Sequence, residues 1–172
     1  MKRGDLRVAA LFSFPRPTFP RTIPSMVAAL LRPESIVVFI EGETKEAILT
    51  ELVDALALDD AHTNRKAILT AVLERESVMS TGIGRGVAVP HARTSEVTGV
   101  HAALGITREP VAFDAVDGKP VRIFILIVAG PDAADAHLRA LSRISGILNR
   151  EEQREALENA TTVADVLTAL EG

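Results

Sequence analysis

The chain has 172 residues, 47% of them hydrophobic and 24% charged, which fits one soluble globular domain and argues against general disorder. It has no cysteine, which excludes disulfides, thiol nucleophiles, iron–sulfur clusters and cysteine-bound zinc. The net charge is −4, and Trp and Tyr are absent, so we expect no nucleic-acid partner. No apolar run approaches the ~18 residues that span a bilayer, so we expect a cytoplasmic protein without membrane insertion.

The N-terminal residues differ from the rest in charge and proline content. The first 24 residues hold four prolines and carry a net charge of +4, so the other 148 residues carry −8. A basic start before the apolar run 8–12 faintly resembles a secretory signal, but the run is too short and no Ala-x-Ala cleavage site follows. We expect a flexible, basic, proline-rich extension over 1–25, or translation from an upstream start codon, and one domain over 26–172.

The first half of this domain alternates between strand and helix patterns. The β-branched run 36–40 predicts a buried strand. Thr44 is placed to cap a helix with one apolar face, and a second helix should cover about 63–75. The glycine-rich segment 80–91 lacks helical periodicity and predicts an irregular loop.

Two further strands are predicted at 100–107 and 121–128, with a hairpin-type Asp117-Gly118 turn before the second. The run 121–128 is apolar at nearly every position, which favours the centre of a sheet. Because strands and helices alternate and the hairpin requires an antiparallel pair, the sequence predicts a layered α/β domain with a mixed sheet.

Three helices are predicted after the Gly-Pro turn at 130–131. The first has an apolar face containing Leu138, Leu141, Ile144 and Leu148. A charged helix begins near residue 151, and a third is opened by the capping-box spacing of 162–165 and ends near 172.

The segment most suggestive of chemistry places Gly82, Gly84 and Gly86 shortly before Pro90 and His91. Glycines at this spacing permit positive φ and let backbone N–H groups converge on an anion, although on glycine spacing alone a tight irregular loop is the favoured interpretation. Pro90 stiffens the approach to His91, whose neutral imidazole is a competent nucleophile that can form a covalent intermediate. The alternative is an ordinary surface histidine.

Two more side chains are candidates for the same chemistry. His137 falls in the first turns of a helix, where the macrodipole disfavours imidazolium, so we expect a neutral ring that donates to a bound phosphoryl oxygen or packs under the loop. Arg75 closes the second helix and either caps its carbonyls or offers a planar fork to a phosphoryl group. His91, His101 and His137 lack zinc-ligand spacing, so we expect no metal, and His62 should be solvated.

The run 80–91, STGIGRGVAVPH, together with 113–121 and 137–141, resembles the enzyme IIA proteins of the bacterial phosphoenolpyruvate-dependent phosphotransferase system. The resemblance is to the fructose/mannitol and nitrogen-regulatory class, and it extends over about 26–170. Three ordered matches make it specific. It departs from the family at Ala92, where glycine is frequent, and at Arg85, which adds a charge within the glycine run.

The resemblance implies a single-domain, three-layer α/β/α sandwich with a mixed sheet, and a phosphotransferase component that needs no cofactor. His91 would be the phosphorylated nucleophile, receiving phosphoryl from the carrier HPr. His137 would be a neutral donor to the phosphoryl group, and Arg75 would give electrostatic support. A phosphoryl loop would be formed by Ser80, Thr81, Gly82, Gly84 and Gly86.

The resemblance leaves the downstream role open. A transport component passes phosphate to a sugar-specific IIB domain, whereas a regulatory member controls target proteins according to its phosphorylation state. No IIB or membrane IIC segment is fused to this sequence, which favours the regulator. An interaction module of the same fold that is not phosphorylated is the other alternative, although the presence of His91, His137 and Arg75 together argues against it.

Overall fold

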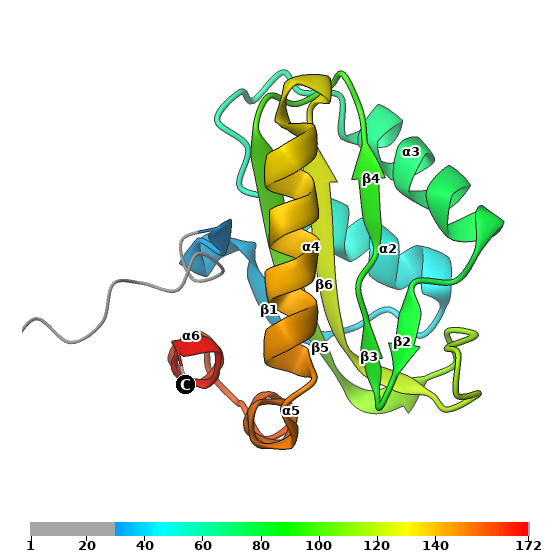
Figure 1. The fold of residues 1–172 in the computed structure, drawn as a ribbon, viewed down its shortest axis with the longest axis vertical. Helices are drawn as coiled ribbons and strands as arrows, with labels where there is room; N and C mark the ends of the chain where they lie inside the picture. Colours follow the sequence, from blue (N-terminus) through cyan, green and yellow to red (C-terminus); the bar gives the residue numbers. More distant parts are fainter. Residues whose placement is uncertain (1–29, 172) are drawn as a thin grey trace, which may run out of the picture.

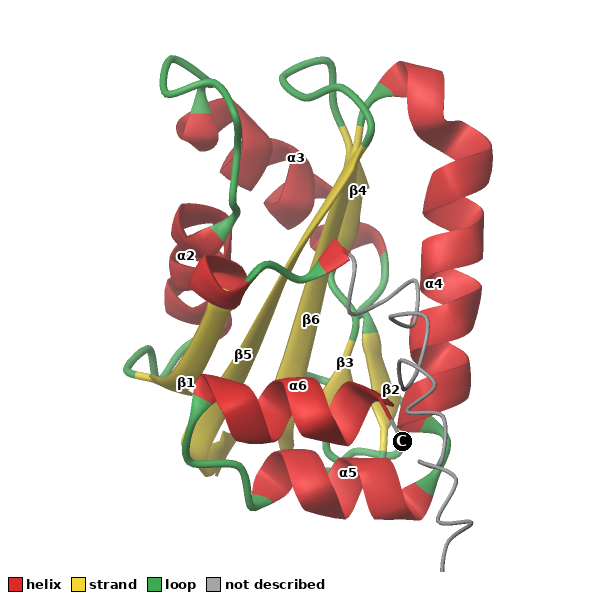
Figure 2. Ribbon diagram, turned by 90° about the vertical axis from the view of Figure 1, so that its left-hand side faces the viewer, coloured by secondary structure: helices red, strands yellow, loops and turns green. Residues whose placement is uncertain are grey.

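The computed structural model describes residues 30–171, which form one mixed β-sheet with helices packed on both faces (Figures 1 and 2). This confirms the predicted three-layer α/β/α architecture. The predicted extension over 1–25 lies outside the described residues and stays a prediction.

The sheet has its longest antiparallel pair at the centre. In spatial order the strands are β1 (Ile36–Ile40), β5 (Val100–Val111), β6 (Val121–Ala129), β3 (Val87–Ala88) and β2 (Gly82–Gly84), and β4 (His91–Arg93) also pairs with β6. Strand β5 runs antiparallel to β6, whereas β3 and β4 run parallel to it. The sheet is therefore mixed, and β6 is the central strand that its sequence predicts.

Within residues 30–171, five helices cover the sheet, together with two short 3₁₀ turns, η1 (Pro33–Ser35) and η2 (Pro131–Ala133). They are α2 (Lys45–Ala55), α3 (Arg65–Val78), α4 (Ala134–Leu148), α5 (Glu151–Glu158) and α6 (Val163–Glu171). Helices α2 and α3 lie on one face, and α4, α5 and α6 lie on the other (Figure 2). No described helix is long and apolar enough to cross a bilayer.

The side chains of β6 fill both cores. Ile123, Ile125 and Ile127 pack in the cluster with α4, α5 and α6, while Phe124 and Leu126 pack in the cluster with α2 and α3. Successive strand residues point to opposite faces, so a strand buried on both sides is apolar at consecutive positions. Strand β6 therefore contributes side chains to the apolar cores on both faces of the sheet.

Helix starts follow the predicted capping chemistry. The Thr44 hydroxyl accepts the Ala47 N–H at 3.2 Å, as predicted. Asn64 caps α3, close to the predicted start near residue 63, and that helix continues to Val78, three residues beyond the predicted end.

Two predicted features are wrong. Segment 80–91 is not irregular, because it forms the β2–β3 hairpin and then the first residue of β4. In α4 the predicted apolar face is correct at Ile144 and Leu148, which are buried, and at Leu141, which packs partly buried against the core, but it is wrong at Leu138, which is 67% exposed, while His137 and Ala140 are buried. The stripe that meets the sheet therefore begins one residue earlier than hydrophobicity alone indicates, because a histidine occupies its first position.

Candidate functional site

An open pocket of about 480 Å³ lies where the last turns of α3, strand β4 and the start of α4 meet. Figure 1 shows β4 between these two helices, and in the described sheet it pairs only with β6. The pocket is lined by Ala71, Glu74, Arg75, Val78, His91, Ala92, Arg93 and His137. The structure thus brings His91, His137 and Arg75 together from three elements that are distant in sequence.

His91 is the first residue of β4 and is held by backbone on both sides. Its strand register places it opposite Ile127, and the Ile127 N–H donates to the Pro90 carbonyl at 2.9 Å. The Nδ1 atom of His91 lies 2.9 Å from the Val89 carbonyl oxygen. A carbonyl oxygen can only accept, so Nδ1 carries the hydrogen and Nε2 keeps its lone pair. The half-buried ring therefore presents Nε2 as its basic, nucleophilic nitrogen.

His137 lies beside His91 in a drier environment. The ring centroids are 5.8 Å apart with an interplanar angle of 72°, and His137 is 5% exposed. Its Nε2 is buried and has no hydrogen-bond partner within the described part of the chain. Burial lowers the pKa of His137, and the nearby charges of His91 and Arg93 lower it further. Burial is the largest of these causes, so the structure favours the neutral form of the ring.

Two arginines supply positive charge to the pocket. Arg75 stands in the last turn of α3 and donates from Nη1 to the Met79 carbonyl at 3.0 Å, so it caps the helix while lining the pocket. Arg93 donates from Nη2 to the Pro131 carbonyl at 3.4 Å. Arg93 is not among the side chains that the sequence singles out for this site. The missed signal was strand alternation, because residues 91 and 93 of β4 share one face.

The five residues predicted to form a phosphoryl loop do not line this pocket. The Ser80 hydroxyl donates to the Phe113 carbonyl at 2.7 Å, and Thr81 is bonded to the Glu76 carboxylate. Gly82 continues into β2, while Gly84 and Gly86 form the β2–β3 turn with φ of +86° and +76°.

The hairpin turn lies at the far end of the hairpin from β4 (Figure 1). Between its glycines Arg85 has a φ of +57°, a left-handed conformation that a non-glycine residue adopts at some cost. Its N–H donates to the Asp117 carboxylate at 2.8 Å. That bond lowers the pKa of Asp117, and the Lys119 N–H lowers it further. In this structure the glycines shape a turn.

The pocket thus combines a nucleophilic imidazole, a neutral histidine with a free ring nitrogen, and two guanidinium groups. Such a set suits a small multiply charged anion that becomes bonded to nitrogen, since charge and donors surround the accepting atom. No group of three or more His, Asp or Glu side chains in residues 30–171 has the arrangement of a metal site.

Comparison with known proteins identifies the class. A family model described as "Phosphoenolpyruvate-dependent sugar phosphotransferase system, EIIA 2" matches residues 29–172. The chain therefore belongs to the type 2 EIIA family of this phosphotransferase system. Proteins of this family are phosphotransferase components.

Relatives carry two kinds of name. A fructose-specific EIIA component of Haloferax volcanii is 39% identical over 128 residues, which is 72% of this chain and 82% of that protein. A nitrogen regulatory protein of Pseudomonas aeruginosa is 31% identical over 133 residues, covering 77% and 86%. A fructose-specific EIIABC component of Bacillus subtilis is 37% identical over 144 residues, covering 82% of this chain and 23% of its own length.

Solved structures show the same fold. The nitrogen regulatory protein IIA-Ntr of Neisseria meningitidis superposes with a TM-score of 0.78 at 31% identity, covering 85% of this chain and 99% of that one. Enzyme IIA mannitol of Escherichia coli, solved in complex with phosphorylated enzyme IIB mannitol, gives a TM-score of 0.67 at 24% identity, covering 82% and 98%.

Proposed function

We propose that this protein is a phosphohistidine carrier that accepts a phosphoryl group on His91 Nε2 from HPr and passes it on or uses it as a regulatory mark. The observation that supports this most directly is the hydrogen bond from His91 Nδ1 to the Val89 carbonyl. It leaves the Nε2 lone pair free in a pocket that also contains two arginines and a second histidine.

The transfer is an in-line displacement at phosphorus. The His91 Nε2 lone pair forms the new N–P bond as the N–P bond to the donor histidine of HPr breaks, and that histidine keeps the electron pair. No proton has to leave His91, because Nε2 carries none beforehand. The phosphorylated ring keeps its Nδ1 hydrogen on the Val89 carbonyl.

His137, Arg75 and Arg93 stabilise the transferred group in this proposal. A neutral His137 donates from Nε2 to a phosphoryl oxygen, which gives that buried atom its missing partner. The two guanidinium groups balance charge that spreads over the phosphoryl oxygens during transfer. A loaded pocket therefore satisfies a polar atom that the unphosphorylated protein leaves unpaired.

The surroundings of the pocket suit protein partners. Val78, Met79 and Leu138 are 80%, 68% and 67% exposed, and they stand at the end of α3 and the start of α4. Exposed apolar side chains beside a charged site are typical of a docking surface. The phosphoryl donor and acceptor in this proposal are both proteins, so an open pocket with an apolar rim fits the role better than a deep cavity.

The acceptor belongs to one of two classes. The E. coli enzyme IIA mannitol was solved in complex with an enzyme IIB, and other relatives are named nitrogen regulatory proteins. The proposal therefore includes either a sugar-specific IIB domain or a regulatory target as the next partner. We assign the function to residues 26–172 and to the cytoplasm, where phosphoenolpyruvate is available.

The test is phosphoryl transfer from phosphoenolpyruvate through enzyme I and HPr of the same organism. One acid-labile phosphate per molecule is expected in wild type, with none in His91→Ala, while His62→Ala is labelled normally because its side chain is exposed. Equal labelling of His91→Ala would contradict the assignment. A wild type that is not labelled at all would instead favour an interaction module of the same fold. Offering purified IIB domains and target proteins to the labelled chain then separates transport from regulation.

A further inference from the structure

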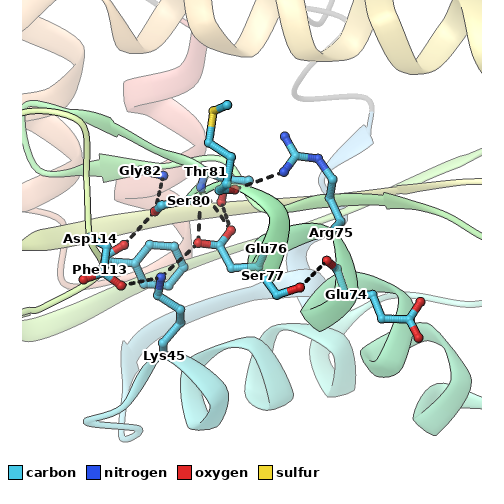
Figure 3. A network of polar contacts seen from close by, with 11 residues as sticks. Lys45, Glu74, Arg75, Glu76, Ser77, Ser80, Thr81, Gly82, Phe113 and Asp114 are labelled. Carbon is cyan, nitrogen blue, oxygen red and sulfur yellow. Dashed lines mark hydrogen bonds and ion pairs between the residues drawn. The ribbon is translucent and has the colours of Figure 1, made fainter.

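A buried carboxylate lies behind the pocket and outside the chemistry described above. Glu76 follows Arg75 in the last turns of α3, and its side chain is 4% exposed. A buried charge is costly unless ion pairs and hydrogen bonds compensate it. Figure 3 shows that its partners come from the N-terminus of α2 and from the segment just before β2.

The carboxylate is satisfied almost entirely by one residue and one cation. The Thr81 N–H donates to both oxygens at 3.2 and 3.0 Å, and the Thr81 hydroxyl donates to Oε2 at 2.5 Å. Lys45 Nζ donates to Glu76 Oε1 at 3.1 Å and to Asp114 at 2.9 Å, and it lies 4.5 Å from the Phe113 ring centroid. Burial alone would lower the pKa of Lys45, but the bonds to Asp114 and Glu76 outweigh it and raise that pKa above its ordinary value.

Thr81 connects this carboxylate to the nucleophile. The Thr81 carbonyl accepts the Val89 N–H at 3.0 Å, and the Val89 carbonyl accepts His91 Nδ1 at 2.9 Å. A continuous path of hydrogen bonds therefore runs from Lys45 and Glu76 through Thr81 and Val89 to the imidazole. Each link is fixed by an atom that can act only as donor or only as acceptor, apart from the ring itself.

We infer that Glu76, paired with Lys45, is a positioning residue that fixes the Nδ1–H tautomer of His91 through Thr81 and Val89. The inference rests on the proposed phosphorylation of His91. The Val89 carbonyl selects the tautomer, Thr81 holds the Val89 peptide in register, and the carboxylate holds Thr81. Without the Glu76 carboxylate, the Thr81 N–H and hydroxyl lose their acceptor, and the Val89 carbonyl is no longer held in position to accept the hydrogen of His91 Nδ1.

Thr81 gains a different role from the one its glycine-rich context suggests. It was predicted to contact the phosphoryl group, but its N–H and hydroxyl are both directed at Glu76. In this arrangement Thr81 acts on the reaction through Val89 and His91 rather than by touching the phosphate. The two roles differ in what they do to unphosphorylated protein, because only the positioning role changes the His91 tautomer before any phosphate is present.

The decisive variant is Glu76→Gln. It keeps the shape of the side chain but replaces one accepting carboxylate oxygen by an amide N–H₂, which cannot accept the hydrogen bonds from Thr81 and Lys45. Long-range ¹H–¹⁵N correlation at about pH 8, above the usual histidine pKa, reports which His91 nitrogen carries the hydrogen. Wild type is expected to be in the Nδ1–H form. In Glu76→Gln the Nε2–H form should become populated, and phosphoryl uptake should slow by about 10- to 100-fold, as expected for a misplaced reacting group.

Glu51→Gln is the matched control. Glu51 also accepts two backbone N–H groups, from Glu41 at 3.2 Å and Gly42 at 2.6 Å, but neither bond leads toward His91. It should keep the wild-type tautomer and uptake rate. A second pair separates positioning from general loosening, because Thr81→Val removes the hydroxyl link and should shift the tautomer, while Thr81→Ser restores it.

Two results would overturn the inference. One is a folded Glu76→Gln protein whose His91 ¹⁵N shifts and uptake rate equal those of Glu51→Gln. The other, which decides if Glu76→Gln does not fold, is a Thr81→Val protein with the same His91 tautomer as Thr81→Ser. Failure of the proposed function is a separate result: wild type would then take no phosphate on His91, while the tautomer comparison in unphosphorylated protein would still decide whether Glu76 orients the ring.

Discussion

The two ends of the glycine-rich hairpin are used differently. At one end Gly84, Arg85 and Gly86 form a turn in which all three residues have positive φ. The Arg85 N–H of this turn donates a hydrogen bond to the Asp117 carboxylate. At the other end the chain emerges as Pro90 and His91 and enters a pocket with a nucleophilic nitrogen. The conspicuous glycines therefore shape the backbone, while the proposed chemistry lies in a pocket formed by His91 and side chains from α3, β4 and α4.

If the pocket end of the hairpin carries the reaction, the largest effect on phosphoryl uptake is expected from a change at His137. Replacing it by leucine removes the buried Nε2 donor but keeps an apolar side chain of similar size on the buried face of α4. Phosphoryl uptake by His91 should fall by about 100-fold, as for loss of one preorganised donor. The free energy of unfolding should not fall, because an unpartnered buried nitrogen is removed. Single-turnover labelling and urea unfolding measure the two quantities, and uptake at the wild-type rate would remove His137 from the mechanism.

A smaller effect is expected at Arg93. Its guanidinium is exposed and lies at the pocket margin, where solvent screens its charge. Arg93→Gln should slow uptake by about 10-fold, and the loss should shrink in high salt if the role is electrostatic. Arg143→Gln, on an exposed part of α4, is the control and should leave the rate unchanged. A salt-independent loss would assign Arg93 a structural role through Pro131 instead.

A substitution in the glycine turn, at the other end of the hairpin, should change the stability of the protein but not the rate of phosphoryl uptake. Gly84→Ala places a Cβ 3.0 Å from the Asp117 carboxylate at a φ of +86°. The free energy of unfolding should fall by about 1–2 kcal/mol. Uptake per folded molecule should be unchanged. Gly146→Ala, in α4 with no neighbour within 4 Å of the new Cβ, should instead stabilise by about 0.5–1 kcal/mol. Slower phosphoryl uptake per folded molecule in Gly84→Ala would contradict a purely structural role and would indicate that the glycine turn takes part in the phosphoryl site.

The smallest predicted effect is a pH dependence of stability. Burial, then the charges of His91 and Arg93, keep the pKa of His137 below its ordinary value, whereas an unfolded histidine titrates near about 6.5. As the pH drops below that value the unfolded chain binds a proton that folded His137 does not, so the free energy of unfolding falls between about 6.5 and the folded pKa. It is constant above about 6.5, and it levels off again below the folded pKa. His137→Leu lacks this loss, so its unfolding free energy relative to wild type should rise on acidification, and parallel pH profiles would contradict the shift.

Local chemistry made parts of the fold predictable. Thr44 caps α2 as its sequence indicates, and Thr162 and Asp165 exchange reciprocal capping bonds at 3.1 and 2.9 Å. These features depend on residues three positions apart. The apolar run of β6 predicts a central strand because a strand buried on both faces needs apolar side chains at consecutive positions.

Features that depend on distant residues were not predictable in the same way. The short β2 and β3 strands exist because β6 offers a pairing edge, so segment 80–91 gave no periodicity of its own. The link from Glu76 to Thr81 is likewise invisible in the sequence, since an acidic residue in the last turn of α3 is ordinarily solvated. His91, His137 and Arg75 were singled out by residue type and family pattern, but their proximity is a property of the fold.

The central claim is that His91 Nε2 carries the phosphoryl group, and the most direct measurement is the nitrogen to which phosphorus is bonded. Protein labelled with ¹⁵N-histidine and phosphorylated by HPr should show one-bond ³¹P–¹⁵N coupling at His91 Nε2, with Nδ1 still protonated on the Val89 carbonyl. Coupling at Nδ1, or at another histidine, would contradict the account.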